Sequence, residues 1–200
     1  MEEADRIAGL YERHAATFDR VRGREFLEKP WIDRFAAPLT AGAAVLDLGC
    51  GSGEPMAASL IDRGFAVTGV DSSETLIGLC RARHPKGDWH VGDMRGFKSE
   101  KTFAGILAWH SFFHLAPDDQ RAMFPRFAAM AAPGAMLMFT SGPAHGVVIG
   151  RFAGEPLYHA SLDAAEYRAL LAQSGFSVVE HVVQDPDCGG ATVWLAQKAG

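Results

Sequence analysis

The stretch Val45-Leu46-Asp47-Leu48-Gly49-Cys50-Gly51-Ser52-Gly53 decides the fold of this 200-residue chain. It begins as a short apolar run, which is typical of a strand buried on both faces of a sheet, and ends in alternating glycines. Glycine adopts positive φ angles and has no Cβ, so a ligand can approach the backbone of such a loop closely. The stretch therefore predicts a ligand-binding turn directly after a buried strand.

The spacing of the glycines restricts the ligand. A dinucleotide-binding loop needs G-x-G-x-x-G, whose last glycine lets a helix approach a pyrophosphate. Counted from Gly49 that position is Glu54, and counted from Gly51 it is Met56. The Gly-Lys-Ser/Thr of a phosphate-binding P-loop is absent as well. We therefore expect a ligand without phosphate groups.

Strand and helix patterns alternate outward from this loop. Apolar runs at 43–48, 65–70, 89–91, 103–109 and 135–140 predict strands, and segments 55–63, 74–84 and 117–132 predict helices. Such alternation indicates a parallel sheet with helices on both faces. After a helix at 164–174, two strands at 176–183 and 191–197 are joined by a tight turn, which makes them antiparallel. The fold class is thus α/β, a doubly wound, mostly parallel sheet with a C-terminal antiparallel hairpin.

The length of the chain favours one domain, spanning 1–200. Residues 1–40 have helical periodicity, and 41–141 carry the alternating pattern. Segment 142–162 is long for a loop and partly apolar, and loops of this kind are usually functional or disordered. Because it follows the fifth strand on the ligand side, we interpret it as a cover over the ligand site. Residues 163–200 hold the last helix and the hairpin, with Asp163 and Glu166 as a capping box.

Two acidic residues follow the next strands along the chain. Asp71 ends the second strand, where a carboxylate can accept hydrogen bonds from both hydroxyls of a ribose. Asp93 ends the third strand, where it can accept a hydrogen bond from an exocyclic amine while Met94 covers an apolar ring face. The carboxyl ends of parallel strands meet at one edge of a sheet, so these residues are expected near the glycine loop.

Five motifs in this order resemble the class I S-adenosylmethionine-dependent methyltransferases. They are V-L-D-L-G-C-G-S-G (45–53), V-T-G-V-D-S-S (67–73), G-D-M (92–94), G-I-L-A-W-H-S-F-F-H-L (105–115) and the turn Pro133-Gly134. The resemblance covers residues 40–141 closely. It implies a Rossmann-like, seven-stranded sheet and an enzyme that moves a methyl group from S-adenosylmethionine, its cofactor, to a small-molecule acceptor by in-line displacement.

The resemblance also implies roles for single residues. Gly49, Gly51 and Gly53 would pass beneath the methionine and ribose part of the cofactor, and Asp47 would reach its amino group. Asp71 would hold the ribose with Ser72 beside the adenine, and Asp93 and Met94 would line the adenine pocket. Trp109 and His110 would face the sulfonium and the acceptor. The segment from Tyr11 to Asp19 is similar to a lid of small-molecule members, with Phe18 where that subgroup often has tyrosine.

An acceptor that must lose a proton calls for a base. His110 is our candidate for a base or acceptor contact, with His114, Tyr158 and His159 as candidate acceptor-binding residues. His110 and His114 are four residues apart, but no H-E-x-x-H motif accompanies them, so we predict a structural hydrogen bond for His114 and no metal site.

Composition excludes several classes of function. The formal net charge is −5, with 48% hydrophobic and 22% charged residues, which is typical of a globular protein. A net negative charge does not favour binding to nucleic acid, whose phosphates need clustered Lys and Arg. The cluster from Arg20 to Arg24 is explained as a solvated helix face at least as well as by a phosphate-binding patch. No apolar run is long enough to span a membrane. The composition therefore indicates neither a nucleic-acid partner nor a membrane span.

The cysteines and the first residues indicate a compartment. Cys50, Cys80 and Cys188 have no C-x-x-C spacing, and their odd number argues against a disulfide framework. The first ten residues contain two glutamates and no basic stretch before an apolar run, unlike a signal peptide. We expect a reduced, cytoplasmic protein.

Two other functions stay open from sequence. A protein that binds S-adenosylmethionine without catalysis would keep the same motifs. A nicotinamide-dependent reductase on a similar sheet would need the G-x-G-x-x-G that is missing. Within methyltransferases, Ala108-Trp109-His110-Ser111 stands where many nucleic-acid and protein amide methylators have Asn/Asp-Pro-Pro-Tyr, which favours a small-molecule acceptor.

Overall fold

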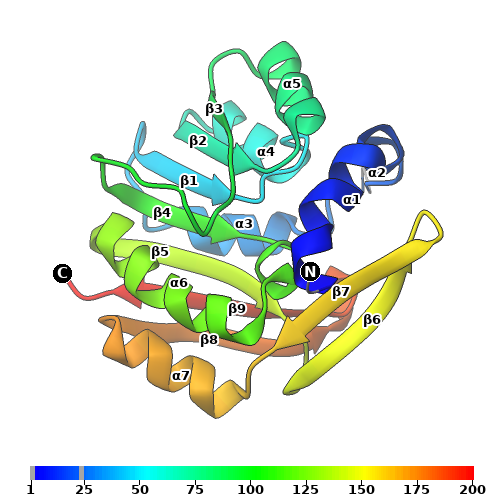
Figure 1. Cartoon of the computed structure of the whole chain (residues 1–200). Coiled ribbons are helices and arrows are strands. Elements are labelled where there is room, and N and C mark those ends of the chain that lie inside the picture. The colour runs from blue at the N-terminus through cyan, green and yellow to red at the C-terminus, as the bar shows by residue number, and fades with distance from the viewer. Residues whose placement is uncertain (1–2, 23–24) are drawn as a thin grey trace.

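A seven-stranded sheet runs through the centre of the computed structural model, which describes residues 3–22 and 25–200 (Figure 1). The strand order is β3-β2-β1-β4-β5-β9-β8. The first five strands in this order are parallel, and β9 and β8 are antiparallel to their neighbours. The strands are β1 (Ala44–Leu48), β2 (Ala66–Asp71), β3 (Asp88–Val91), β4 (Phe103–Ala108), β5 (Ala131–Ser141), β8 (Phe176–Asp185) and β9 (Ala191–Lys198). The predicted fold class is confirmed.

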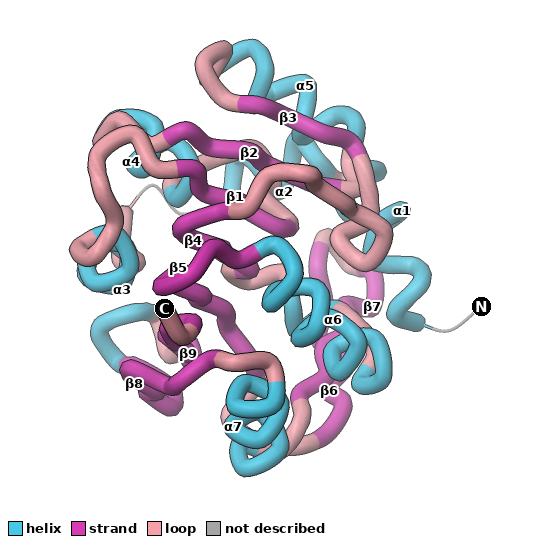
Figure 2. Tube along the Cα trace, turned by 90° about the vertical axis from the view of Figure 1, so that its left-hand side faces the viewer, coloured by secondary structure: helices cyan, strands magenta, loops and turns pink. Residues whose placement is uncertain are grey.

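Helices cover both faces of the sheet (Figure 2). On one face, α3 (Lys29–Ala36), α4 (Met56–Asp62) and α5 (Glu74–Arg83) bury Trp31, Leu60 and Ile77 in one apolar cluster. On the other, α6 (Pro117–Met130) and α7 (Ala164–Gln173) bury Phe124 and Leu171 in a second. The parallel strands between the clusters are almost wholly apolar because both of their faces are covered. Among the helices of the described residues, none is long and apolar enough to cross a membrane.

The N-terminal segment is helical, as its periodicity predicts, but in separate pieces. A 3-10 helix η1 (Glu3–Arg6) leads into α1 (Ile7–Arg13), and α2 (Ala15–Val21) follows after His14, whose φ of −111° interrupts the helix. The helices α1 and α2 lie at the end of the sheet where the parallel strands terminate (Figure 1). This position lets the segment cover whatever binds there.

The segment 142–162 is not the loop that we expected. It contains a two-stranded antiparallel sheet, β6 (Gly146–Phe152) and β7 (Glu155–Ser161), which projects beside α1 (Figure 1). Ala153 and Gly154 connect the strands with φ angles of 50° and 85°. Positive φ at both central residues is what a tight hairpin turn with the correct twist requires. The β-branched run Val147-Val148-Ile149 suits a strand.

Two local expectations about helix ends also need correction. Strand β5 begins at Ala131, before the Pro133-Gly134 turn that we expected to precede it, and its pairing with β4 shifts register there. Asp163 does cap α7, accepting a hydrogen bond from the Ala165 amide. Glu166 does not complete a capping box, because its carboxylate pairs with Arg121.

Candidate functional site

A cavity of about 340 Å³ lies where β1, β2 and β4 end. The helix α1 and the hairpin strand β7 cover it, since Ile7, Ala8, Tyr11, Leu157 and His159 are part of its wall. Most sequence-predicted site residues line it. They are Tyr11, Asp47, Gly49, Gly51, Asp71, Ser72, Asp93, Met94, Trp109, His110, His114 and His159.

The glycine loop forms the floor of the cavity. Gly49 and Gly51 have φ angles of 74° and 58°, a region that other residues rarely adopt. A Cβ on Gly49 would lie 2.2 Å from the Cβ of Ser111. Gly53 does not line the cavity, contrary to expectation. A Cβ at this position would meet the side chains of Cys80 and His84, so the glycine makes room for α5 to pack.

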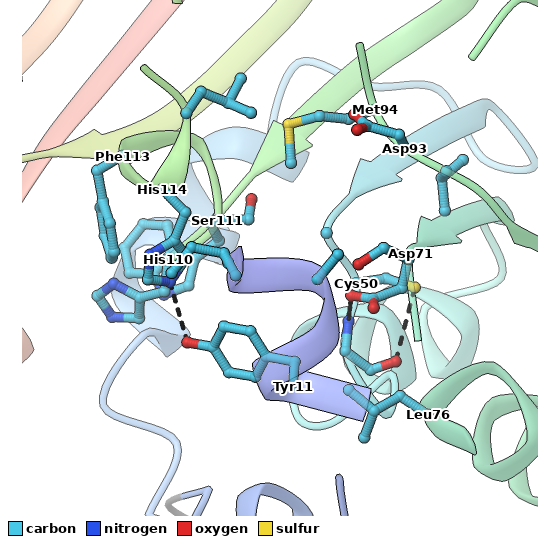
Figure 3. Close-up of a pocket in the computed structure, with 18 of the residues that line it drawn as sticks. Tyr11, Cys50, Asp71, Leu76, Asp93, Met94, His110, Ser111, Phe113 and His114 are labelled. Atoms are coloured by element: carbon cyan, nitrogen blue, oxygen red, sulfur yellow. Dashed lines mark hydrogen bonds between the residues drawn. The ribbon is translucent and has the colours of Figure 1, made fainter. Parts of the chain in front are cut away.

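Asp71 holds the glycine loop in place. Its Oδ2 accepts a hydrogen bond from the Gly51 amide at 2.9 Å (Figure 3). Its Oδ1 accepts one from the Ser73 amide, also at 2.9 Å. Burial raises the pKa of the carboxyl. A carboxylate oxygen has lone pairs for more than one donor, so Asp71 can still accept hydrogen bonds from a ligand hydroxyl.

Asp47 is buried at the cavity wall with 3% of its surface exposed. No side chain or amide of the described residues makes a hydrogen bond to its carboxylate. Burial, and secondarily the charge of Asp71, raise the pKa of Asp47 to about 7. A buried carboxylate without a donor is unfavourable unless a cation or a donor reaches it. This point of the wall is therefore suited to a ligand ammonium group.

Arg22 is a cavity residue that the sequence analysis missed. We grouped it with Arg20 as a solvated face, which holds for Arg20, whereas Arg24 lies outside the described residues. Arg22 Nη2 donates to Glu28 Oε1 at 2.7 Å, and the Glu28 side chain is only 6% exposed. The signal was its spacing of eleven residues after Tyr11 and four after Phe18, which is the spacing of one helical face.

The wall of the cavity that follows β3 is fixed in place by Arg95. Arg95 donates from Nε and Nη2 to Asp93 and from Nη1 to Asp119 Oδ2 at 2.7 Å. Burial raises the pKa of Asp93, but the hydrogen bonds from Arg95 outweigh it and the pKa falls below its usual value. Asp93 is therefore a fixed anion beside Met94, and both line the cavity.

His114 is locked into the wall at the opposite end. Its Nε2 lies 2.9 Å from the Tyr11 hydroxyl (Figure 3). Its Nδ1 lies 2.8 Å from the Tyr158 carbonyl oxygen. A carbonyl only accepts, so Nδ1 carries the proton and Nε2 accepts from Tyr11. Burial lowers the pKa of His114 to about 3. Both ring nitrogens are used, which leaves His114 a structural role.

Tyr158 supplies that carbonyl oxygen, but it does not line the main cavity. This differs from our expectation that Tyr158 binds the acceptor there. It lines a second cavity between α1 and the hairpin, together with Leu10, Arg13 and Pro156. The next residue, His159, points the other way because successive side chains of a strand alternate. His159 lines the main cavity and stacks on His114 with ring centroids 4.9 Å apart.

His110 has a strained backbone with a φ of 49°. Its amide donates to Thr140 Oγ1 at 2.9 Å, which helps to hold this conformation. Its ring borders the cavity between Trp109 and Phe113. Burial, and then the charge of Arg22, lower the pKa of His110 to about 4, so the imidazole is neutral at pH 7. Strain of this kind concentrates at functional sites.

Within residues 3–22 and 25–200, no group of three or more His, Cys, Asp or Glu side chains is arranged to hold a metal ion. Trp109 is 5% exposed, and its indole Nε1 has no hydrogen-bond partner in the described part of the chain. The site thus offers carboxylates at one end and neutral imidazoles and aromatic rings at the other.

Comparisons with known proteins agree with this arrangement. Residues 45–134 match the model of a family described as a methyltransferase domain. The chain is 30% identical to a trans-aconitate 2-methyltransferase of Methylobacterium nodulans, over 75% of this chain and 64% of the relative. It is 32% identical to a ubiquinone biosynthesis O-methyltransferase of Aromatoleum aromaticum, over 58% of this chain and 50% of the relative. The chain spans about half the length of the curated relatives that it matches.

Among solved structures, the chain is similar to 1,6-didemethyltoxoflavin-N1-methyltransferase of Burkholderia thailandensis, solved with 1,6-didemethyltoxoflavin and S-adenosylhomocysteine. The TM-score is 0.77 at 21% identity, and the superposition covers 98% of this chain and 89% of the other. This likeness shows that the two chains share a fold.

Proposed function

We propose that this chain, whose residues 45–134 match a methyltransferase-domain family, is a class I S-adenosylmethionine-dependent methyltransferase that transfers a methyl group from S-adenosylmethionine to a small molecule. The single observation that carries the proposal is the unpartnered, buried carboxylate of Asp47 at the wall of the cavity. It supplies a counter-charge for the cofactor's ammonium group beside a floor of glycines.

The described residues fit both ends of the cofactor. Asp47 and Arg22 border the same cavity, and the charge of Arg22 acts on Asp47. A carboxylate and a guanidinium that border one cavity can bind the ammonium and the carboxylate of one amino-acid group. Asp71 accepts from the ribose, and Asp93 and Met94 bind the adenine with Ser72 beside it. Gly49 and Gly51 leave the room that this requires.

When bound, S-adenosylmethionine supplies an electrophilic methyl group on a sulfonium that leaves readily. The chain itself contributes alignment and exclusion of water. Tyr11 and Phe18 close the cavity from the N-terminal side, and Phe152 packs against both rings. His110 lies past the end of β4 with a neutral imidazole, so it can accept a proton from an acceptor.

We propose a small-molecule acceptor because the cavity is covered by α1 and the hairpin. Relatives named for trans-aconitate, a ubiquinone precursor pathway and 1,6-didemethyltoxoflavin support this class. Segments 1–40 and 142–162 then act as lid and acceptor-site cover within one domain of 1–200. The three cysteines are free thiols, which supports a location in the cytoplasm.

Calorimetric titration tests the cofactor. We expect S-adenosylmethionine and S-adenosylhomocysteine to bind with micromolar affinity and NADH not to bind. 5′-Methylthioadenosine lacks the amino-acid end, so it should bind more weakly by about tenfold or more, which is the loss expected for a charge-assisted pair. Equal affinity of methylthioadenosine and S-adenosylhomocysteine would contradict the roles of Asp47 and Arg22. Binding of NADH alone would favour a reductase.

A second measurement separates the enzyme from a protein that only binds the cofactor. Release of S-adenosylhomocysteine from labelled S-adenosylmethionine is followed with pools of small-molecule acceptors. Turnover with any acceptor supports the enzyme. Tight cofactor binding without turnover across chemically diverse pools would favour the binding protein.

A further inference from the structure

The acceptor end of the cavity has an unusual chemical character. Figure 3 shows His110, Phe113 and His114 at the end away from Asp71 and Asp93. Besides aliphatic residues, Ser111 and Arg22, the wall of the cavity carries seven aromatic or imidazole side chains. They are Tyr11, Phe18, Trp109, His110, Phe113, His114 and His159.

Two imidazoles at this end are free to bind a ligand. His114 is fully used by Tyr11 and the Tyr158 carbonyl. The rings of His110 and His159 make no hydrogen bond within the described residues. Burial lowers the pKa of both, so each neutral ring presents one donor and one acceptor nitrogen. A ligand here meets two uncharged hydrogen-bonding rings, with the charge of Arg22 acting on one of them, His110.

Charged acceptors fit this end poorly. Five carboxylates line the cavity. Three of them, Asp47, Asp71 and Asp93, are assigned to the cofactor, while Asp5 pairs with Arg95 and Glu54 with His84. An ammonium group among the neutral rings would therefore find no free carboxylate in this lining, and burying it unpaired is costly. A carboxylate would have to compete with the cofactor's own carboxylate for the remaining donors of Arg22, whose Nη2 is already paired with Glu28 at 2.7 Å.

The cavity wall already contains the contact that an acceptor could make. The Tyr11 hydroxyl donates to the neutral imidazole of His114 at 2.9 Å, in a nest of rings that includes Phe18 and Phe152. A phenol and a neutral imidazole are therefore compatible with this environment. His110 offers a second imidazole of the same kind, and that one is free.

We propose that the methyl acceptor is an uncharged, planar aromatic molecule with a ring-bound hydroxyl, which packs against Trp109, Phe113 and His159 and donates its hydroxyl hydrogen bond to His110. This inference rests on the proposed function, since it names the acceptor of the same site. It goes further by specifying the acceptor's charge, shape and reacting atom.

The transfer step balances in protons and electrons. The hydroxyl proton passes to the free acceptor nitrogen of His110, which becomes an imidazolium. The acceptor oxygen forms a bond to the methyl carbon while the bond between that carbon and sulfur breaks. The electron pair of the broken bond stays on sulfur, which becomes an uncharged thioether. The imidazolium returns its proton to water after the methylated product leaves.

Three probes that share one ring test the acceptor class. Phenol, benzoate and benzylamine are titrated into protein saturated with S-adenosylhomocysteine, and the imidazole side-chain signals are followed by NMR. For ligands of this size we expect a Kd on the order of millimolar. Phenol should shift the His110 and His159 signals and bind at least about tenfold more tightly than the two charged probes. Benzoate or benzylamine binding as tightly as phenol would overturn the proposal, as would phenol leaving both signals unmoved at about ten times that concentration.

Single substitutions test the residues. His110→Asn and His159→Asn should each weaken phenol binding by about tenfold at most, the worth of one hydrogen bond or ring contact. Affinity for S-adenosylhomocysteine should stay as in the unchanged protein. His90→Asn is the matched control, because His90 is an exposed histidine on β3 and does not line the cavity. If phenol affinity in His110→Asn equals that of the control, His110 is not the contact.

The two proposals fail in distinguishable ways. Loss of S-adenosylhomocysteine binding in the unchanged protein would remove the proposed function. If S-adenosylhomocysteine binds but phenol does not, the proposed function stands and the acceptor class is wrong.

Discussion

Asp47 shows the cost of a ligand site at the scale of one residue. Its carboxylate is buried without a hydrogen-bond donor from the described residues, and its pKa of about 7 is raised chiefly by that burial. The unfolded chain ionises Asp47 more readily than the folded protein does. The free energy of unfolding is therefore highest below about pH 4, where Asp47 is protonated in both states, and it decreases as the pH rises toward 7.

Asp47→Asn should stabilise the protein and impair its cofactor site. An amide has no charge to desolvate, so the free energy of unfolding at pH 8 should rise by at most about 4 kcal/mol. The gain should shrink as the pH falls toward 5. Urea denaturation at both pH values measures it, and calorimetry should show weaker S-adenosylhomocysteine binding. An unchanged free energy of unfolding at pH 8 would mean that Asp47 is solvated or paired.

Arg22 permits a complementary test. Arg22→Met alone would leave the buried Glu28 without its partner and destabilise the protein. The double change Arg22→Met with Glu28→Gln removes both charges. We expect it to fold and to bind S-adenosylhomocysteine about tenfold or more weakly, with affinity for 5′-methylthioadenosine unchanged. Arg20→Met, at the exposed neighbouring arginine, is the control. Equal weakening of both ligands would indicate a general distortion of the site.

At the scale of elements, α1 is tied to its neighbours on two sides. The Glu12 carboxylate accepts hydrogen bonds from the Ser73 hydroxyl and from the Thr75 amide and hydroxyl, at the N-terminus of α5. A negative charge is favourable at that end of a helix. Glu155 on β7 pairs with Arg13 and His14. The helix thus bridges the cofactor end and the hairpin.

Glu12→Ala should loosen this cover without unfolding the sheet. Hydrogen exchange of the amides in α1 and α2 should become faster, while exchange in β1 and β4 stays as slow as before. Binding of S-adenosylhomocysteine should slow exchange of the lid again in both proteins. Arg20→Ala serves as the control, because that side chain is exposed and, among the described residues, donates a hydrogen bond to the nearby Thr17. Unchanged exchange in α1 would show that the hydrogen bonds from Ser73 and Thr75 to Glu12 do not hold the lid in place.

At the scale of the whole molecule, the position of the site residues depends on the packing of the apolar core. Phe112 is fully buried and packs against Phe124, Phe127, Phe139 and Tyr167. It belongs to the same short 3-10 helix, η2 (Phe112–His114), that carries Phe113 and His114 into the cavity. The aromatic cluster therefore connects packing of α6 and α7 to the position of the acceptor end.

Phe112→Ala should destabilise the protein by roughly 3–5 kcal/mol, the usual cost of removing a fully buried phenyl ring. Urea denaturation measures the loss. Because η2 loses its anchor, the Tyr11–His114 contact should also loosen, visible as a changed His114 imidazole signal in NMR. Phe113→Ala is the comparison, since that ring is only half-buried and should cost less. Equal losses for the two would contradict this account of the core.

Local patterns in the sequence were enough for the sheet and for part of the site. Buried parallel strands produce apolar runs, helices produce three- and four-residue spacing, and both can be recognised within a dozen residues. The glycine loop and Asp71 could be predicted for the same reason, because a strand end, its loop and the next strand end meet at one edge of the sheet. The doubly wound, mostly parallel sheet with its C-terminal antiparallel hairpin followed from these elements and is confirmed.

Tertiary structure alone decided the rest. Tyr11 and His114 meet across 103 residues, and Arg13 reaches Glu155 across 142, which no local pattern encodes. Arg22 faces the cavity only because α1 and α2 fold over the strand ends, while Gly53 and Tyr158 turn away for reasons of packing. The run 142–162 has strand residues, but its pairing depends on a two-residue turn. The sequence by itself determined which elements form and in what order, since that depends on neighbours along the chain. Which side chains meet in the cavity depends on neighbours in space.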